Sequence, residues 1–272
     1  MENIQLYHED CLEVVDKLEL NKIYNMDCLE YMKTLPNESV DLIIADPPYF
    51  QVVKETWDNQ WQTEKDYLNW CKLWIAECER ILKTEGNIVI WGQLGEKHIT
   101  YARMLVMLED EFDELKRKNI VTVKRTKGQG TSNNFMSNRE EFIWLTKVKK
   151  GYTFNKQYTT ELKKNYGYKV NQSKPPYKVA GNVWIDIVWD DIVFPWFGSK
   201  IEPYMNTAQK PLLACSRIIN GLSNENDIVY IPFAGSGSEI ESCIINNRNW
   251  VATELNRRYI DEIIIPRIEK HQ

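Results

Sequence analysis

Long apolar runs are missing from this sequence. No stretch approaches the roughly 20 apolar residues that a membrane-spanning helix needs. The opening residues, MENIQLYHED, have neither the basic start nor the apolar core of a secretory signal. We therefore expect a protein of the cytoplasm with no membrane partner.

Clusters of metal ligands and paired cysteines are also missing. The histidines lie far apart, and no two cysteines form a Cys-x-x-Cys pair; the residues are His8, His98 and His271, and Cys11, Cys28, Cys71, Cys78, Cys215 and Cys243. Structural zinc sites and disulfide frameworks are built from more closely spaced residues. The sequence therefore predicts no metal site.

Acidic residues are scarce in one part of the chain. The 272 residues carry a net charge of −5, but the segment from Lys116 to Lys178 holds sixteen Lys and Arg residues and only three acids. Basic side chains can pair with phosphates while aromatic rings stack on bases. The segment therefore favours a nucleic-acid partner, although its charge alone also allows a solvated basic face whose aromatic rings pack inward. Its aromatic residues are Phe135, Trp144, Tyr152, Phe154, Tyr158, Tyr166, Tyr168 and Tyr177.

Strand-like and helix-like stretches alternate along the remainder of the chain. This alternation is typical of a mostly parallel sheet with crossover helices. A chain of this length can form one large α/β domain with an insertion. The expected strands are residues 22–25, 41–45, 87–91, 119–124, 141–146, 227–231 and 249–253.

One amphipathic helix is expected over residues 65–83, with Gly86 ending it, because glycine is common just past a helix. From residue 147 to 205 the periodicity weakens, and turn residues such as Pro175 and Gly181 appear. We therefore divide the chain into residues 1–146, an inserted lobe of residues 147–205, and residues 206–272. The apolar face of the expected helix comprises Tyr67, Trp70, Leu73, Trp74, Cys78, Ile81 and Leu82.

The tetrapeptide Asp46-Pro47-Pro48-Tyr49 follows the apolar strand 41–45. Each proline fixes its own φ and restricts the residue before it, so the Asp46 carboxylate and the Pro47 carbonyl form a rigid pair of acceptors. Such a pair suits the amino group of a nucleobase, because it can hold the hydrogens while the lone pair is aimed at an electrophilic methyl group. Tyr49 offers a face on which the base can stack. A bare Asp-Pro-Pro would indicate only a proline turn with a capping aspartate, but the aromatic residue and the preceding strand favour catalysis.

A glycine-containing turn, Pro232-Phe233-Ala234-Gly235-Ser236-Gly237-Ser238, follows the strand 227–231 and precedes a helical run over residues 239–247. Glycines let a ligand approach the backbone, and the N–H groups of a helix N-terminus attract electron-rich groups. Glu254 ends the next strand, where dinucleotide-type folds place the acid that binds ribose hydroxyls. No lysine follows the glycines, which excludes a P-loop.

The order of these motifs resembles that of the β-class of DNA amino-methyltransferases, which methylate N6 of adenine or N4 of cytosine. Asp-Pro-Pro-Tyr stands upstream, Phe-Ala-Gly-Ser-Gly stands downstream, and a basic segment lies between them. The resemblance implies a Rossmann-like, seven-stranded S-adenosylmethionine-dependent methyltransferase fold with an inserted target-recognition lobe. It also implies S-adenosylmethionine as cofactor and DNA as partner. Aspartate at the head of the catalytic motif is typical of the adenine enzymes, so Asp46 favours N6 of adenine.

The resemblance also assigns roles to individual residues. Asp27 looks like the acid beside the cofactor adenine, and Asp10, in an earlier copy of Asp-Cys-Leu-Glu, is its rival. Lys210, in Gln-Lys-Pro, matches an element that helps to hold the methionine part of the cofactor. The expected catalytic residues are Asp46, Pro47, Pro48 and Tyr49. The expected cofactor-binding residues are Asp27, Asp46, Lys210, Pro232, Phe233, Ala234, Gly235, Ser236, Gly237, Ser238 and Glu254. The expected DNA-binding residues are Lys124, Arg125, Lys127 and Arg139.

Two departures from the family pattern leave alternatives open. Ile231 stands where the family usually has aspartate, and the strand 119–124 lacks the tryptophan often found near Thr122. The first departure keeps a non-catalytic DNA-binding or partner subunit with the same fold as an alternative, and a cytosine-N4 enzyme would share every motif named above. The resemblance further allows a homodimer and a cognate restriction enzyme as partners.

Overall fold

One large sheet organises the chain. The computed structural model describes residues 18–51, 60–94, 98–129, 133, 135, 137–162, 175–187 and 209–271, except for the side chains of residues 126–129. Within these residues the sheet has eight strands in the order β1-β10-β9-β2-β3-β5-β4-β8. The strands are β1 (Lys22–Tyr24), β2 (Val40–Ala45), β3 (Leu82–Gly92), β4 (Lys116–Gln129), β5 (Ser137–Thr146), β8 (Val183–Trp184), β9 (Ile228–Ile231) and β10 (Asn249–Thr253).

Most of the sheet is parallel, as the alternation of elements predicted. β1, β10, β9, β2 and β3 pair in parallel, whereas β5 is antiparallel to both of its neighbours, β3 and β4. All seven expected strands are present, and the expected α/β fold class is confirmed. The eighth strand, β8, comes from the segment that we expected to form a separate lobe, and it pairs with Thr122 and Val123 of β4. A strand of two residues is too short to show a period in the sequence.

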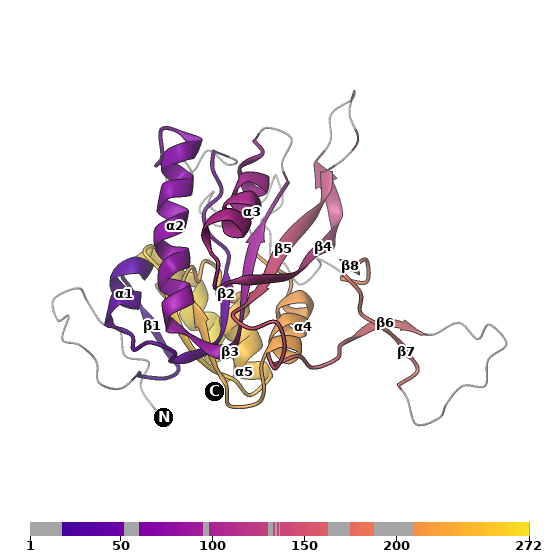
Figure 1. Ribbon diagram of the computed structural model, residues 1–272. Coiled ribbons are helices and arrows are strands. Elements are labelled where there is room, and N and C mark those ends of the chain that lie inside the picture. The colour runs from indigo at the N-terminus through magenta and orange to yellow at the C-terminus, as the bar shows by residue number, and fades with distance from the viewer. Residues whose placement is uncertain are drawn as a thin grey trace, which may run out of the picture.

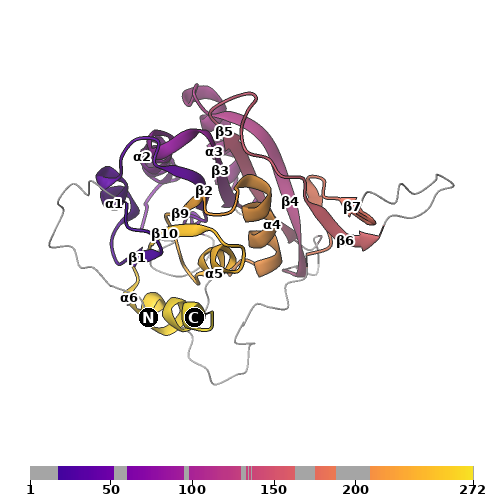
Figure 2. The ribbon, with the colours of Figure 1, turned by 90° about the horizontal axis from the view of Figure 1, so that it is seen from below.

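Helices cover both faces of the sheet (Figures 1 and 2). Successive residues of a strand point to opposite faces, and Ile43 of β2 accordingly packs in one core cluster while Leu42 and Ile44 pack in the other. The first cluster lies under α1 (Cys28–Thr34), α2 (Glu64–Ile81) and α3 (Thr100–Glu111). The second lies under α4 (Leu212–Leu222), α5 (Ser238–Ile245), the π-helical segment η3 (Ile260–Ile264) and α7 (Ile265–Glu269). The single turn α6 (Arg257–Tyr259) directly precedes η3.

A second, two-stranded sheet stands apart from the main one. It is formed by β6 (Tyr158–Leu162) and β7 (Tyr177–Val179), which are antiparallel and project from the body of the molecule (Figure 1). Among the helices that the structure describes, we find none of the length and apolar character that crossing a membrane requires.

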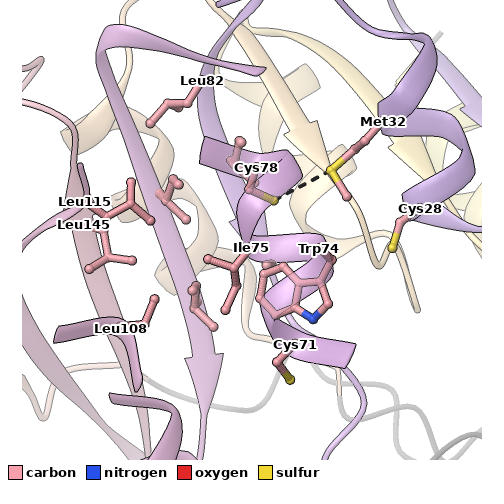
Figure 3. Packing of buried hydrophobic residues seen from close by; sticks show 14 of the residues in the cluster. Cys28, Met32, Cys71, Trp74, Ile75, Cys78, Leu82, Leu108, Leu115 and Leu145 are labelled. Atoms are coloured by element: carbon pink, nitrogen blue, oxygen red, sulfur yellow. Dashed lines mark hydrogen bonds between the residues drawn. The ribbon is translucent and has the colours of Figure 1, made fainter. Parts of the chain in front are cut away.

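The long helix α2 packs its buried face against α1 and the sheet (Figure 3). A capping box between Thr63 and Asp66 begins the helix. Figure 3 shows the side chain of Met32 reaching α2, where its Sδ lies 3.8 Å from Sγ of Cys78. The expected apolar face was wrong at Leu73, which is 60% exposed. Trp74, Cys78 and Ile81 of the expected face are fully buried, and Cys71 and Ile75, which we did not expect, are fully buried with them.

Gly86 does not end this helix, contrary to our expectation. α2 stops at Ile81 and β3 begins at Leu82, so Gly86 lies inside the strand. A Cβ atom at Gly86 would come within 2.8 Å of the Asp41 carbonyl oxygen and 2.7 Å of Cδ1 of Leu82. The glycine therefore allows the backbone of β2 to approach closely, which is a second common reason for glycine in a strand.

Candidate active site

Four neighbouring parallel strands end at one edge of the sheet and carry the expected site residues there. Asp27 follows β1, Glu254 follows β10, Pro232 follows β9, and Asp46 follows β2. Ligands of open α/β sheets bind at such carboxyl ends. A cavity of about 420 Å³ opens between them. It is lined by Met26, Asp27, Cys28, Asp46, Pro47, Pro48, Tyr49, Gln60, Trp70, Gln93, Lys210, Pro232, Phe233, Ala234, Gly235, Ser236, Glu239, Thr253, Glu254, Leu255, Asn256 and Tyr259.

Hydrogen bonds fix the Asp-Pro-Pro-Tyr turn at this edge. The Tyr49 hydroxyl donates to Oδ1 of Asp46 at 3.0 Å, and the Tyr67 hydroxyl of α2 donates to the Pro48 carbonyl at 2.9 Å. No donor to the Pro47 carbonyl occurs within the described residues. All four residues of the turn line the cavity.

Lys210 joins the turn to two further elements. Its side chain is 1% exposed, and Nζ lies 2.6 Å from Oδ2 of Asp46 and 3.4 Å from Oε2 of Glu140 in β5. Burial alone would lower the pKa of Lys210, but the two carboxylates outweigh it and raise that pKa above its ordinary value. The ammonium also lies over the rings of Tyr49 and Trp91, 5.7 and 5.4 Å from their centroids. Lys210 is therefore a charged, fixed neighbour of Asp46.

Glu140 is a member of this network that we did not predict. It is 4% exposed, and burial raises its pKa while Lys210 and Arg125 lower it. Its signal in the sequence was an acid, followed by Glu141, in an otherwise basic segment. The position of Glu140 beside Lys210 depends on strand pairing, which the sequence did not reveal.

The glycine-containing turn meets Glu254 on the other side of the cavity. The Gly235 N–H donates to Oε2 of Glu254 and the Asn256 N–H donates to Oε1, both at 2.8 Å. Burial raises the pKa of Glu254, while these backbone donors lower it. Gly235 has a φ of +50°, and a Cβ there would meet no atom within 4 Å. The backbone of this loop is consequently open to a ligand.

Gly237 and Ser238 do not line the cavity, although we expected them to contact the cofactor. Gly237, with a φ of +75°, caps α5, and a Cβ there would lie 3.2 Å from Cγ1 of Ile264. Ser238 is fully buried and exchanges a hydrogen bond with Ser236 at 3.1 Å. Both residues face the protein interior, so they support the loop on the side away from the cavity.

Asp27 lines the cavity from the β1 end and also begins α1. Its Oδ1 accepts hydrogen bonds from the Leu29 and Glu30 N–H groups, at 2.8 and 3.4 Å. The rival residue, Asp10, lies outside the described residues. Ile231 is fully buried in the second core cluster and brings no polar group to the cavity.

An aromatic wall completes the site, and sequence reasoning missed its role. Trp70 lines the cavity and packs against Phe233 with ring centroids 5.7 Å apart, and against Trp61 at 4.6 Å. We predicted Trp70 only as part of an apolar helix face. Glu239, in the first turn of α5, is a second lining residue that we did not single out.

The residues that we expected to bind DNA lie on β4 and β5, outside the cavity lining. Lys124 is exposed and lies opposite Arg139 in the β4–β5 pairing. Arg139 is half exposed and pairs with Glu141 at 3.0 Å, while Arg125 lies 3.4 Å from Glu140. The side chain of Lys127 lies outside the described part of the chain. Within that part we find no group of His, Cys, Asp and Glu suited to a metal ion.

This chain is similar in sequence to known DNA methyltransferases. The N6_N4_Mtase family model, described as DNA methylase, matches residues 40–265. The chain is 33% identical over 250 residues to the type II methyltransferase M.BamHI of Bacillus amyloliquefaciens, covering 87% of this chain and 55% of M.BamHI. It is 30% identical over 263 residues to the DNA adenine methyltransferase YhdJ of Escherichia coli K12, covering 89% of this chain and 81% of YhdJ. The chain therefore spans about half the length of M.BamHI.

Solved structures share the fold. The PvuII DNA methyltransferase, described as cytosine-N4-specific, superposes with a TM-score of 0.65 at 19% identity, covering 92% of this chain and 90% of that one. TTHA0409, a putative DNA modification methylase of Thermus thermophilus in complex with S-adenosyl-L-methionine, has a TM-score of 0.59 at 19% identity, with 92% and 95% covered. Because the family model matches most of its length, the chain belongs to the N6/N4 family of DNA methylases.

Proposed function

We propose that this chain methylates N6 of adenine in DNA, with S-adenosylmethionine as the methyl donor. The observation that carries the proposal is that one cavity is lined both by Asp46-Pro47-Pro48-Tyr49 and by the Gly235 turn with Glu254. Had the two loops opened onto different clefts, a methyl group could not pass between them. Aspartate at the head of the catalytic motif and the likeness to YhdJ, a DNA adenine methyltransferase, support adenine as the base.

The residues of the cavity suit the proposed cofactor. The open backbone at Gly235 gives a ligand close access, the ring of Trp70 offers an apolar face, and about 420 Å³ is a usual volume for a cofactor site. Asp27 and Glu254 provide carboxylates for ribose and adenine groups at the β1 and β10 ends. S-adenosylmethionine, when bound, supplies an electrophilic methyl group on a sulfonium sulfur.

The catalytic turn acts on the amino group of a base flipped out of the duplex. Asp46 and the Pro47 carbonyl accept the two amino hydrogens, which turns the nitrogen lone pair toward the methyl donor. The Tyr49 hydroxyl donates a hydrogen bond to Asp46, which fixes the ring of Tyr49 on which the base stacks. The ion pair with Lys210 holds the Asp46 carboxylate in place. None of the cysteines adjoins the catalytic tetrapeptide, and a direct transfer needs no covalent intermediate.

Residues 147–205, together with Lys124, Arg125, Lys127 and Arg139, are proposed to position the DNA and select its sequence. The likeness to M.BamHI, a type II methyltransferase, supports a cognate restriction enzyme as a partner. We also propose a homodimer, from the family resemblance, and a cytoplasmic location, from the composition.

The direct experiment incubates the protein with labelled S-adenosylmethionine and unmethylated genomic DNA. Nucleoside analysis of the product then separates N6-methyladenine from N4-methylcytosine, and long-read sequencing maps the modified sites. N4-methylcytosine in the product would show that the protein is a cytosine-N4 enzyme, like the PvuII enzyme, which has the same fold. DNA binding with no incorporated label would instead identify a non-catalytic subunit.

The matched variant is Asp46→Ala, which removes one of the two acceptors. We expect no detectable methyl transfer and largely intact binding of S-adenosylhomocysteine, because Glu254, Asp27 and the Gly235 turn are unchanged. Tyr49→Phe is the control, since it removes only the hydroxyl and should lower the rate without abolishing it. Strong residual transfer by Asp46→Ala would show that the chemistry lies elsewhere.

A further inference from the structure

Glu239 is an acid in the cavity to which neither of the sequence motifs assigns a role. It stands in the first turn of α5, directly after the glycine-containing turn, and lines the same cavity as Gly235 and Glu254. Its side chain is 4% exposed. A carboxylate held out of water at the wall of a ligand cavity requires a partner.

The protein supplies that partner only weakly. Within the described residues, the Glu239 carboxylate has the backbone N–H of Glu239 itself as a donor, and the one donor from another side chain is Sγ of Cys215, 3.7 Å from Oε1, a weakly donating thiol. Two cations act electrostatically on Glu239, but Lys210 donates to Asp46 at 2.6 Å, and Arg267 of α7 donates to Glu241 at 3.0 Å. Both cations are thus directed at other acids.

The location of Glu239 indicates which part of a ligand it would meet. Asp27 and Glu254 stand at the β1 and β10 ends of the cavity, whereas the catalytic turn stands at the β2 end. Asp46 and Lys210 both act electrostatically on Glu239, which therefore lies toward the catalytic end. A methyl donor with its adenosine at the β1 and β10 end has its amino-acid part in this region.

We propose that the Glu239 carboxylate binds the α-ammonium group of the cofactor's methionine part, an inference that rests on the proposed function. An ammonium carries three donors and a full positive charge, so it satisfies the buried carboxylate through charge-assisted hydrogen bonds. Ile231, at the end of β9, is apolar and buried, so it offers no acid for this purpose. Glu239 is the acid of the glycine-containing region that the fold turns into the cavity.

The electrostatics of the ligand-free cavity agree with this assignment. Burial, followed by the charge of Asp46, raises the pKa of Glu239 to about 7, although Lys210, the backbone N–H of Glu239 and Arg267 each lower it. A bound ammonium would favour the ionised carboxylate. Binding of an ammonium-bearing ligand should therefore release a proton below about pH 7.

The test compares two ligands that differ only in the ammonium group. Isothermal calorimetry at pH 8 measures the Kd of S-adenosylhomocysteine and of its deaminated analogue, which keeps the thioether and the carboxylate. The variant is Glu239→Gln, which keeps the size of the side chain and removes its charge. Glu241→Gln is the matched control, because Glu241 lies on the same helix turn and is not part of the cavity lining.

We expect Glu239→Gln to raise the Kd of S-adenosylhomocysteine about ten- to a hundredfold, as for loss of a hydrogen bond between charged groups, and to leave the Kd of the deaminated analogue unchanged. Glu241→Gln should change the Kd of neither ligand. An equal effect of Glu239→Gln on both ligands, or none on S-adenosylhomocysteine, would overturn the inference. Glu239→Thr repeats the comparison if the Gln variant melts early. Failure of the unaltered protein to bind S-adenosylhomocysteine would instead overturn the proposed function.

Discussion

Nζ of Lys210 lies 2.6 Å from Oδ2 of Asp46, although the two residues are 164 positions apart in the chain. The contact joins the residue that precedes α4 to the turn that follows β2. Glu140 of β5 and Glu239 of α5 act electrostatically on the same ammonium. A single buried cation therefore stabilises a group of carboxylates drawn from several parts of the fold, and this makes it a sensitive point for mutation.

Lys210→Met should destabilise the protein in a pH-dependent way. Removing one partner of a buried ion pair leaves uncompensated charge and costs about 3–5 kcal/mol. Without the cation the pKa values of Glu140 and Glu239 rise further, so stability is lost as pH rises through them and regained when the carboxyls are protonated. In urea unfolding, the free energy of unfolding of Lys210→Met should be far below that of the unaltered protein at pH 8 and only slightly below it at pH 5.

Lys83→Met serves as the control for that experiment. Lys83 pairs with Asp41 at 2.8 Å, but its side chain is 41% exposed, and solvent screening limits such a pair to about 0–1 kcal/mol. An equal deficit of Lys210→Met at both pH values would mean that lost packing, rather than lost charge, explains it.

Much of the site could be predicted because strand ends are readable. Asp46 and Pro232 each follow a short apolar strand, and parallel strands end at a common edge, so the two loops were expected to meet. The sequence placed Lys210 and Asp46 in the same site but did not predict their ion pair, because the geometry of that pair depends on how α4 packs. Glu140 stood out only as one of two adjacent acids in a basic segment, and Glu239 did not stand out at all, since burial decides the importance of both.

The expectations that proved wrong concern residues whose local sequence fits more than one structure. Gly86 was taken as a helix terminator because glycine is common there, but the same residue also permits close strand approach, and only the position of Asp41 distinguishes the two cases. Leu73 fits a helical period yet is exposed, because Cys71 and Ile75 occupy the buried side. The strand β8 adds its hydrogen bonds to β4 through tertiary pairing alone.

Two glycine variants should separate ligand contact from loop support. Gly235→Ala and Gly237→Ala each place a side chain at positive φ, which costs about 1–2 kcal/mol. Only Gly235 lines the cavity, so its added methyl group should weaken S-adenosylhomocysteine binding about tenfold or more. Gly237→Ala meets Ile264 instead and should lower the melting temperature further, with the Kd little changed. Calorimetry and thermal melting would reveal the reverse pattern if the loop were oriented otherwise.

The buried pair of Arg217 and Asp186 should control DNA affinity. Nη2 of Arg217, on α4, lies 2.6 Å from Oδ2 of Asp186, and both side chains are at most 3% exposed. Asp186 also accepts from the Thr160 N–H of β6, so the pair ties the 147–205 segment to the catalytic core. We expect Arg217→Met to raise the KM for DNA and to leave the Kd of S-adenosylhomocysteine unchanged.

A surface pair provides the control for this prediction. Arg257 and Asp261 are about 40% exposed, and Arg257→Met should change neither quantity. If Arg217→Met weakened both ligands equally, the pair would support the whole fold and not the placement of the recognition segment.

Glu239 should make the ligand-free protein less stable as pH rises. Its pKa is about 7 in the folded chain against an ordinary value of 4.5, so the unfolded chain ionises first. The stability that Glu239 contributes is therefore complete below about pH 4.5 and is lost as pH rises to about 7, by up to about 3 kcal/mol. Glu239→Gln has no such proton, so its stability relative to the unaltered protein should grow by about 2.5 kcal/mol between pH 5 and pH 8 in urea unfolding, because part of the loss already occurs below pH 5. Saturating S-adenosylhomocysteine should reduce this difference at pH 8 by about 1.4–2.7 kcal/mol, the free energy of a ten- to hundredfold difference in Kd, because only the carboxylate gains the ammonium. A difference that the ligand does not change would separate the acid from cofactor binding.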